Sequence, residues 1–342
     1  MRALDRKLLR ELRETRGQGI AIAVLVACAT ATLVAAVTTW RALQRTRDVL
    51  YETHRFPHVF AELVRAPEPV GALVAALPGV AEVETRVMAE ALVEIPGLAD
   101  PASALLRSIP DEGEPRLDRI HLRAGRLPAP GAAGEVVMSE GFAAANRIRP
   151  GDRISAVIDG RWKALSVVGV GISPEHVFTV RPGGILNDDL HYGVLWMSRR
   201  ALAAALDLTG AFNAVAVRLA PGAAEAPVVA GLDRVLAPWG GRGAYGRDLQ
   251  TSHRLVTDEI GQLQVMATTI PVVIFGVAAF LLALVLSRMV AAQRMQVGTL
   301  KALGYADGAV GAHYGALALA LVAVGTAIGV AGGYGLGSAL SS

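Results

Sequence analysis

The sequence of 342 residues contains a single cysteine, Cys28. One cysteine excludes an intrachain disulfide and a cysteine-rich metal site. The sequence also lacks a G-x-x-x-x-G-K-[ST] motif, the loop that holds nucleotide phosphates, and it lacks a G-x-S-x-G elbow. A process driven by ATP would therefore require a separate ATPase, and no catalytic constellation points to an enzyme.

Charged side chains are missing from three long runs, which extend from Gly17 to Trp40, from Ile260 to Ser287 and from Gly308 to Ser342. A transmembrane helix needs roughly 20 apolar residues to cross the hydrocarbon core. Buried helices of a soluble protein are usually shorter and carry a polar stripe. We therefore predict transmembrane helices over 19–40, 260–287 and 311–340, with a cleaved signal peptide as the alternative for the first run.

Basic residues near the first run indicate the orientation, because lysine and arginine resist translocation. More of them precede the run than follow it: Arg2, Arg6, Lys7, Arg10, Arg13 and Arg16 come before, and Arg41, Arg45 and Arg47 come after. We expect a multi-pass protein of the bacterial inner membrane with a cytoplasmic N-terminus, a cytoplasmic loop over 288–310 and an extracytoplasmic region over 41–259. The sequence pI of about 9.2 then reflects topology and anionic lipids rather than nucleic acid.

The first 18 residues place leucines on one helical face among basic residues, which predicts an amphipathic helix on the cytoplasmic side of the membrane. A frayed basic tail is the alternative. The segments 40–56 and 249–266 continue the helical pattern beyond the membrane and are predicted to form two stalks.

The extracytoplasmic region is predicted to be an α+β domain. Strand patterns over 58–64, 80–95, 193–197 and 212–219 alternate with helix patterns over 67–77, 198–206 and 223–236, which suggests a βαβ-like lobe. The middle, about 100–190, has mostly β patterns and is expected to be an insertion lobe. Its clearest hairpin spans 154–170, where Asp159-Gly160 provides a tight turn.

The segment QRMQVGTLKALGY, from Gln293 to Tyr305, lies between the second and third uncharged runs. Val297, Leu300 and Leu303 are three residues apart, and Gly304 can end a helix in a left-handed conformation. The pattern predicts a short amphipathic helix beside the membrane. From periodicity alone, a well-formed loop is an equal alternative.

This segment resembles the cytoplasmic loop of FtsX-like (MacB-type) permease subunits of ABC transporters, which has an R-x-x-[IV]-G-x-L-[KR]-A-[LI]-G signature. The matching residues are Arg294, Val297, Gly298, Leu300, Lys301, Ala302, Leu303 and Gly304. Gly125-Arg126-Leu127-Pro128 and Pro150-Gly151-Asp152 are similar to elements of that family's outer core domain. The resemblance implies a permease half that docks on a cytoplasmic ABC ATPase and pairs with a second permease half.

Glycines recur at intervals of four in the third run: Gly311, Gly315, Gly325, Gly329, Gly333 and Gly337. Small residues let helices approach closely in lipid, where packing drives association. We predict that these glycines form a helix-packing surface, the alternative being that several only reflect composition. Related permeases continue through a further span, so we expect either a fragment or a second polypeptide that supplies the missing helices.

Two motifs are interpreted as structural rather than functional. Gly241-x-Gly243-x-x-Gly246 matches a dinucleotide fingerprint but opens no βαβ unit, so a flexible turn is expected. His54 and His58 have metal-pair spacing, but Pro57 breaks the helix that would align them. No cofactor or metal is expected.

The resemblance to FtsX-like permeases implies a function in transport, and we anticipate export or extraction of a lipid, lipoprotein or hydrophobic compound. The alternative is relay of ATP-driven motion to an extracytoplasmic cell-wall hydrolase or sensor.

Overall fold

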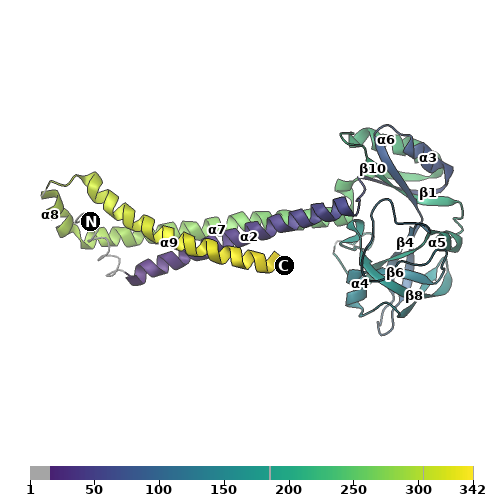
Figure 1. Ribbon diagram of the computed structural model, residues 1–342, viewed down its shortest axis with the longest axis horizontal. Coiled ribbons are helices and arrows are strands. Elements are labelled where there is room, and N and C mark those ends of the chain that lie inside the picture. Colours follow the sequence, from purple (N-terminus) through teal and green to yellow (C-terminus); the bar gives the residue numbers. More distant parts are fainter. Residues whose placement is uncertain (1–15, 185, 303, 342) are drawn as a thin grey trace. The chain divides into compact units, whose positions relative to one another are not determined.

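The computed structural model describes residues 16–184, 186–302 and 304–341 (Figure 1). The chain divides into two compact units. The helical unit comprises Met1–Arg47 and Glu259–Ser342, and the α+β unit comprises Asp48–Asp258. Most of the amphipathic helix expected over residues 1–18 lies outside the described residues.

Four helices account for the described part of the helical unit: α2 (Arg16–Thr53), α7 (Thr251–Ala292), α8 (Arg294–Ala302) and α9 (Asp307–Ser341). Three stretches are long and apolar enough to cross a membrane: Gly19–Thr53, Thr251–Ala292 and Val310–Ala339. The prediction of three long apolar helices is therefore confirmed by their length and composition. Helices α2 and α7 have 38 and 42 residues, so each is roughly twice as long as the hydrocarbon core requires.

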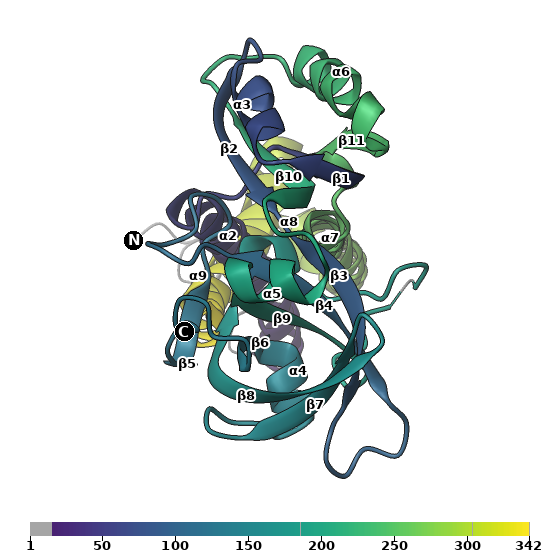
Figure 2. The same ribbon diagram turned by 90° about the vertical axis from the view of Figure 1, so that its right-hand side faces the viewer.

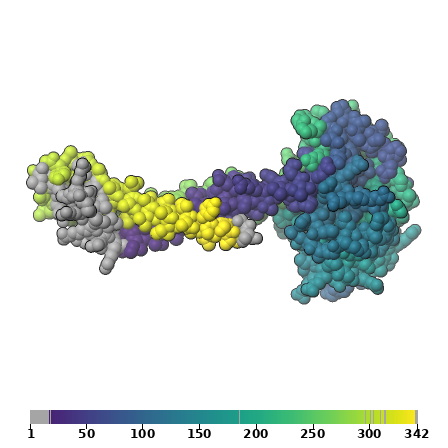
Figure 3. Space-filling view, in the orientation of Figure 1, coloured from purple at the N-terminus to yellow at the C-terminus, as the bar shows by residue number. Residues whose placement is uncertain are grey.

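The long helices of the helical unit pack through small and branched apolar side chains. Ile22 and Val26 of α2 form a buried cluster with Ala278 of α7, and Val322 of α9 packs against it. Helix α9, yellow in Figure 3, runs along the surface of this unit. Much of the remaining surface of α7 is apolar and exposed, as expected for helices that face lipid.

The first sheet of the α+β unit, sheet A, has the strand order β11-β1-β10-β2, and every pairing is antiparallel. Its elements are β1 (Val59–Pro67), α3 (Pro69–Ala75), β2 (Val80–Arg86), β10 (Ala211–Leu219), α6 (Glu225–Leu236) and β11 (Gly241–Gly246). This β-α-β-β-α-β order with interleaved strands is the split βαβ, or ferredoxin-like, arrangement. Helices α3 and α6 cover one face of the sheet (Figure 2).

The second sheet, sheet B, is inserted between β2 and β10 and has the order β5-β8-β6-β9-β4-β3-β7. Its strands are β3 (Met88–Glu94), β4 (Ala102–Ile109), β5 (His121–Gly125), β6 (Glu135–Ser139), β7 (Arg153–Ile158), β8 (Arg161–Ile172) and β9 (Tyr192–Ser198). A further pairing between β7 and β8 closes six of these strands into a ring around a buried apolar core. Helices α4 (Glu140–Ala145) and α5 (Arg199–Ala205) belong to this lobe, and three short 3₁₀ helices lie at Pro174–His176, Ala237–Trp239 and Arg247–Leu249.

Two features differ from the sequence expectations. The inserted lobe is larger than 100–190, because β3, β9 and α5 belong to sheet B rather than to the βαβ-like lobe. Strand β9 is buried on both faces and pairs in parallel with β4, a partner that its apolar sequence does not specify. The glycine-rich segment Gly241–Gly246 is not a flexible turn but the edge strand β11, which pairs with β1.

Several local expectations agree with the structure. The hairpin at Asp159-Gly160 joins β7 to β8, and both turn residues have positive φ angles of 48° and 69°. Such angles match the right-handed twist of the flanking strands. Ser198 caps α5, because its hydroxyl accepts a hydrogen bond from the backbone N–H of Ala201.

Candidate functional site

Helix α8 lies in a short connection between α7 and α9, and polar contacts hold its ends. Gly304 follows it with a φ of 90°, a conformation that favours glycine. The Lys301 ammonium lies 2.7 Å from the Asp307 carboxylate at the start of α9. The Tyr314 hydroxyl donates a hydrogen bond to Gln293, just before α8, at 2.8 Å. The helix is thus tied at both ends to α9.

One face of α8 is used internally. Val297 is half-buried and packs against a cluster of α7 and α9 side chains: Leu286, Met289, Val310, Tyr314 and Leu317. This contact anchors α8 on α7 and α9, and the role of Val297 in docking stays a prediction. The other predicted docking residues with described surroundings are exposed: Arg294, Gly298, Lys301 and Gly304. The side chain of Leu300 and the whole of Leu303 lie outside the described residues.

The structure adds one residue that the sequence reasoning missed. Met295 has 83% of its surface exposed. An apolar side chain with this exposure is suited to contact with another protein. The spacing of Val297, Leu300 and Leu303 drew attention to a different face, and only the position of α9 distinguishes the two faces.

The glycines of α9 fall into two groups. Gly325, Gly329, Gly333 and Gly337 are buried and lie against α2; we call these four the glycine face. A Cβ atom on Gly325, Gly329 or Gly333 would lie 2.6–2.7 Å from a backbone carbonyl oxygen of α2, closer than real contacts allow. Gly311 and Gly315 were also predicted to pack, but nothing lies within 4 Å of the Cβ they lack. Close approach to a described helix is therefore restricted to the glycine face.

An apolar groove of about 610 Å³ lies among α2, α7 and the end of α9. Its lining includes Cys28, Trp40, Leu263, Met266 and Ile270. The Thr39 hydroxyl and the Trp40 indole N–H also belong to this region, and both are buried without a hydrogen-bond partner among the described residues. The groove therefore combines an apolar wall with unsatisfied polar groups near one end.

A buried group of charged residues joins the two lobes of the α+β unit. We call Glu84, Arg86, Arg107, Asp118 and Glu175 the junction cluster; all five are less than a tenth exposed. Arg86 bonds Glu84 at 2.8 Å and Glu175 at 2.6 Å, and Arg107 forms an ion pair with Asp118. Burial alone would raise the pKa of Glu175, but Arg107 and Arg86 lower it to about 2. The cluster connects β2 of sheet A to β4 of sheet B through these ion pairs.

The junction cluster also reaches the beginning of α7. The Gln250 side-chain N–H donates to the backbone carbonyl of Glu175 at 2.7 Å, and the backbone N–H of Phe178 donates to the Ser252 hydroxyl at 3.0 Å. These bonds connect the first turn of α7 to the segment that follows β8.

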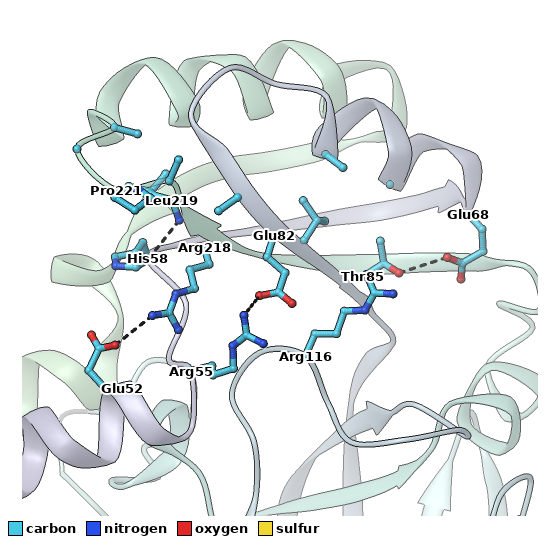
Figure 4. A pocket seen from close by; sticks show the side chains of 17 residues that line it. Glu52, Arg55, His58, Glu68, Glu82, Thr85, Arg116, Arg218, Leu219 and Pro221 are labelled. Atoms are coloured by element: carbon cyan, nitrogen blue, oxygen red, sulfur yellow. Dashed lines mark hydrogen bonds and ion pairs between the residues drawn. The ribbon is translucent and has the colours of Figure 1, made fainter.

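A cleft of the α+β unit, of about 950 Å³, contains mostly paired charges (Figure 4). Glu52 pairs with Arg218, and Glu82 pairs with Arg55. Arg116 extends into the cleft without a described partner. No group of three or more His, Cys, Asp or Glu side chains in the described ranges is placed to hold a metal ion.

Residues 268–342 match the family model of the FtsX-like permease C-terminal domain. This match covers the second half of α7, α8 and α9. The C-terminal part of the chain is an FtsX-like permease domain. The rest of the chain comprises α2, the first half of α7 and the α+β unit.

Three solved structures with similarity to this chain are distant, with TM-scores below 0.5. The extracellular domain of the noncanonic ABC-type transporter YknZ from Gram-positive bacteria is 13% identical, covers 56% of this chain and 98% of its own, and has a TM-score of 0.35. The periplasmic region of MacB from Actinobacillus actinomycetemcomitans is 10% identical, with coverages of 62% and 95% and a TM-score of 0.36. A permease-protein domain from Porphyromonas gingivalis is 14% identical, with coverages of 54% and 81% and a TM-score of 0.31. A comparison with curated proteins finds no match.

Proposed function

We propose that this membrane protein is the permease subunit of an ABC-type transporter and that a separate ATPase drives it by docking on α8. The observation that carries the proposal is the exposed face of α8, held by α9 between two spans of an FtsX-like permease domain. The exposed face combines the apolar Met295 with the cations Arg294 and Lys301. The 342 residues contain no phosphate-binding loop, which supports the assignment of ATP hydrolysis to a separate ATPase.

The proposed orientation places α8 in the cytoplasm and the α+β unit outside. The excess of arginine and lysine before the first span supports this orientation, since basic flanks are retained on the cytoplasmic side. With α2, α7 and α9 as three spans, the connection that contains α8 returns to the same side as the N-terminus. A cysteine placed at Lys301 in a Cys28→Ser background should react with an impermeant maleimide only from the cytoplasmic side.

We further propose that α2 and α7 carry the motion between the two sides. Both are continuous helices that begin in one unit and end in the other. The first turn of α7 is bonded to the segment beside the junction cluster, so displacement of α7 would act on the contact between the lobes. Through this connection, a displacement of α7 during the ATPase cycle would be transmitted to the α+β unit.

The proposed cargo class is a lipid, lipoprotein or other hydrophobic compound. The apolar groove beside Cys28 supports this choice, because its wall suits acyl chains and its unsatisfied Thr39 and Trp40 groups suit a polar head. A second permease half, as the resemblance implies, would complete the pathway.

A second candidate function is mechanotransmission, in which the α+β unit transmits the motion to an extracytoplasmic hydrolase or sensor. The observation that favours it is the absence of charged side chains from all three uncharged runs, since intramembrane charges often mark substrate routes. Stimulation of the ATPase by a lipidated cargo would support export. Co-purification of a cell-wall hydrolase without such stimulation would support mechanotransmission.

The docking proposal is tested at Met295. The tagged chain, expressed in its own host and extracted in dodecyl maltoside, should co-purify with an ABC ATPase. Met295→Asp should lower ATPase recovery by about tenfold, because a carboxylate would lose its hydration at an apolar contact. The matched control is Val49→Asp, which makes the same kind of change at a 64% exposed position of the α+β unit. Equal ATPase recovery with both variants would refute docking through this face.

A further inference from the structure

A cavity of about 310 Å³ lies between the two lobes of the α+β unit. Sheet A contributes Glu62 from β1 and Tyr245 from β11, and sheet B contributes Glu90 from β3 and Tyr192 from β9. The remaining wall comes from the segment after β8 and from the first residues of α7. This volume is at the lower end of the range of small-molecule pockets, roughly 300–1,000 Å³. We call it the interlobe cavity.

The interlobe cavity contains carboxylates whose charge is poorly compensated. Glu90 accepts a hydrogen bond from the Tyr192 hydroxyl at 2.8 Å. Burial raises the pKa of Glu90, and the nearby Glu62 carboxylate raises it further, against the lowering effects of Tyr192 and Arg181. Glu62 has only a 3.7 Å contact with Arg242, and both side chains are well exposed. Such a contact contributes little in water.

Polar groups without partners also face this region. The Tyr245 ring stacks on Phe60, and its hydroxyl forms no hydrogen bond with any described residue. The Nε2 atom of His176 is buried and has no hydrogen-bond partner in the described structure. Burial lowers the pKa of His176 to about 4, so its ring is neutral near pH 7 and does not add a positive charge. A buried nitrogen without a partner, such as Nε2 of His176, is uncommon. Tyr245 is only partly buried, so its hydroxyl remains available to an occupant of the cavity.

The other charged groups around the cavity do not neutralise Glu62 and Glu90. Glu175 belongs to the junction cluster, where Arg86 and Arg107 compensate it. Arg181 is the cation of the lining, and it is exposed at the outer side, where its guanidinium donates to the backbone carbonyl of His191 at 3.4 Å. Each glutamate therefore has one exposed arginine near it, Arg242 beside Glu62 and Arg181 beside Glu90, and exposed pairings of this kind compensate a carboxylate only weakly.

We propose that the interlobe cavity binds an organic ammonium group, with Glu62 and Glu90 as its hydrogen-bond acceptors. An ammonium donates up to three N–H bonds, which suits two carboxylates and a phenolic oxygen. The rings of Tyr192 and Tyr245 offer aromatic faces, which attract cations. The group belongs either to a small free amine or to a lysine side chain of a polypeptide.

An occupant of this cavity touches both lobes and the first turn of α7, because Thr251 and Ser252 belong to the lining. Binding therefore stabilises the arrangement in which the lobes and this turn are bonded together. Through α7, occupancy on the α+β side influences the same helix that leads to α8. This inference goes beyond the transport function proposed above and does not depend on the ATPase.

The test is a calorimetric titration of the full chain in dodecyl maltoside with benzylamine and with benzyl alcohol, its neutral analogue. We expect benzylamine to bind and benzyl alcohol to bind at least about tenfold more weakly, since the alcohol lacks the charge-assisted bonds. Glu90→Gln and, separately, Glu62→Gln should each weaken benzylamine binding by about tenfold. Glu94→Gln is the matched control, because Glu94 is exposed on the same strand as Glu90 and lies outside the cavity.

Equal binding of the amine and the alcohol would overturn the proposal, as would unchanged amine binding in both glutamine variants. Glu62 and Glu90 are both exposed on their strands, so both glutamine variants should fold. A peptide with one lysine, compared with its norleucine counterpart, distinguishes the two sources. Preference for the lysine peptide would identify a polypeptide ligand, and binding of benzylamine alone would identify a small amine.

Discussion

The close contact between α9 and α2 predicts a specific response to a single added methyl group. In Gly329→Ala, the new Cβ would lie 2.6 Å from the carbonyl oxygen of Ala27 and 2.6 Å from the Cβ of Thr30. Ordinary contacts begin at 3.4 Å, so the helices must separate locally by roughly 0.8 Å. A gap of this size forfeits a quarter to a half of the dispersion energy of each affected atom pair.

The expected cost is that of overpacking, about 1–3 kcal/mol of unfolding free energy. The higher helix propensity of alanine offsets about 1 kcal/mol of it. Gly332→Ala is the matched control, because Gly332 lies on the same helix with nothing within 4 Å of its missing Cβ. The control has only the propensity gain, so the two variants should differ by about 1–3 kcal/mol.

The assay is unfolding of the full chain by dodecyl sulfate in mixed micelles with dodecyl maltoside. Gly325→Ala and Gly333→Ala should behave like Gly329→Ala, since their added Cβ atoms meet carbonyl oxygens at 2.6 and 2.7 Å. Gly337→Ala should cost less, because the nearest atom is a side-chain carbon of Thr38 at 3.0 Å. If Gly329→Ala is as stable as Gly332→Ala, the close packing of α9 on α2 is wrong.

Two further predictions concern the α+β unit. Arg86→Met should lower its unfolding free energy by about 3–5 kcal/mol, because Glu84 and Glu175 would remain buried without their main partner. Adding Glu175→Gln should recover part of this loss, and near-ultraviolet circular dichroism during urea unfolding measures both. Burial lowers the pKa of His176 to about 4, below the ordinary 6.5, so the unfolded chain binds that proton more readily. Stability should therefore fall as the pH drops from about 6.5 to 4, and a His176→Gln variant with an unchanged slope would contradict this origin.

Local signals in the sequence predicted many individual elements. The uncharged runs predicted three helices long enough to span a membrane, because a helix in lipid must satisfy its own backbone and expose apolar side chains. Asp159-Gly160 predicted the β7–β8 turn, since positive φ angles require such residues. The helix predicted over 67–77 is present as the shorter α3 (Pro69–Ala75), because Pro67 ends β1 and Pro69 occupies the first turn, where a missing backbone N–H costs nothing.

Assignment of strands to sheets was less successful. The segment of β9 was expected in the smaller lobe, yet it pairs with β4 and β6 in sheet B. The glycine-rich β11 was expected to be a turn, and its pairing with β1 overrides its low strand propensity. Both outcomes depend on pairing with strands that are distant in sequence. The local sequence of an apolar or glycine-rich segment does not specify which strand it pairs with.

The docking face illustrates the same limit on the scale of a single helix. A three-residue spacing identified α8 as amphipathic, but the pattern did not tell which apolar residues face inward. Val297 packs on the α7 and α9 cluster, and Met295 is left exposed. The interlobe cavity had no sequence signal, because Glu62 and Glu90 lie on strands of different sheets.

The sequence by itself determined the membrane spans, the short helix between them and most local elements of the α+β unit, because each depends on residues that are neighbours in the chain. Tertiary structure decided which glycines of α9 meet α2, which face of α8 remains free, and how carboxylates and arginines from separate strands form the junction cluster. The physical reason is that packing and charge pairing depend on distances in space. Those distances are set by chain folding over more than 80 residues between Arg86 and Glu175.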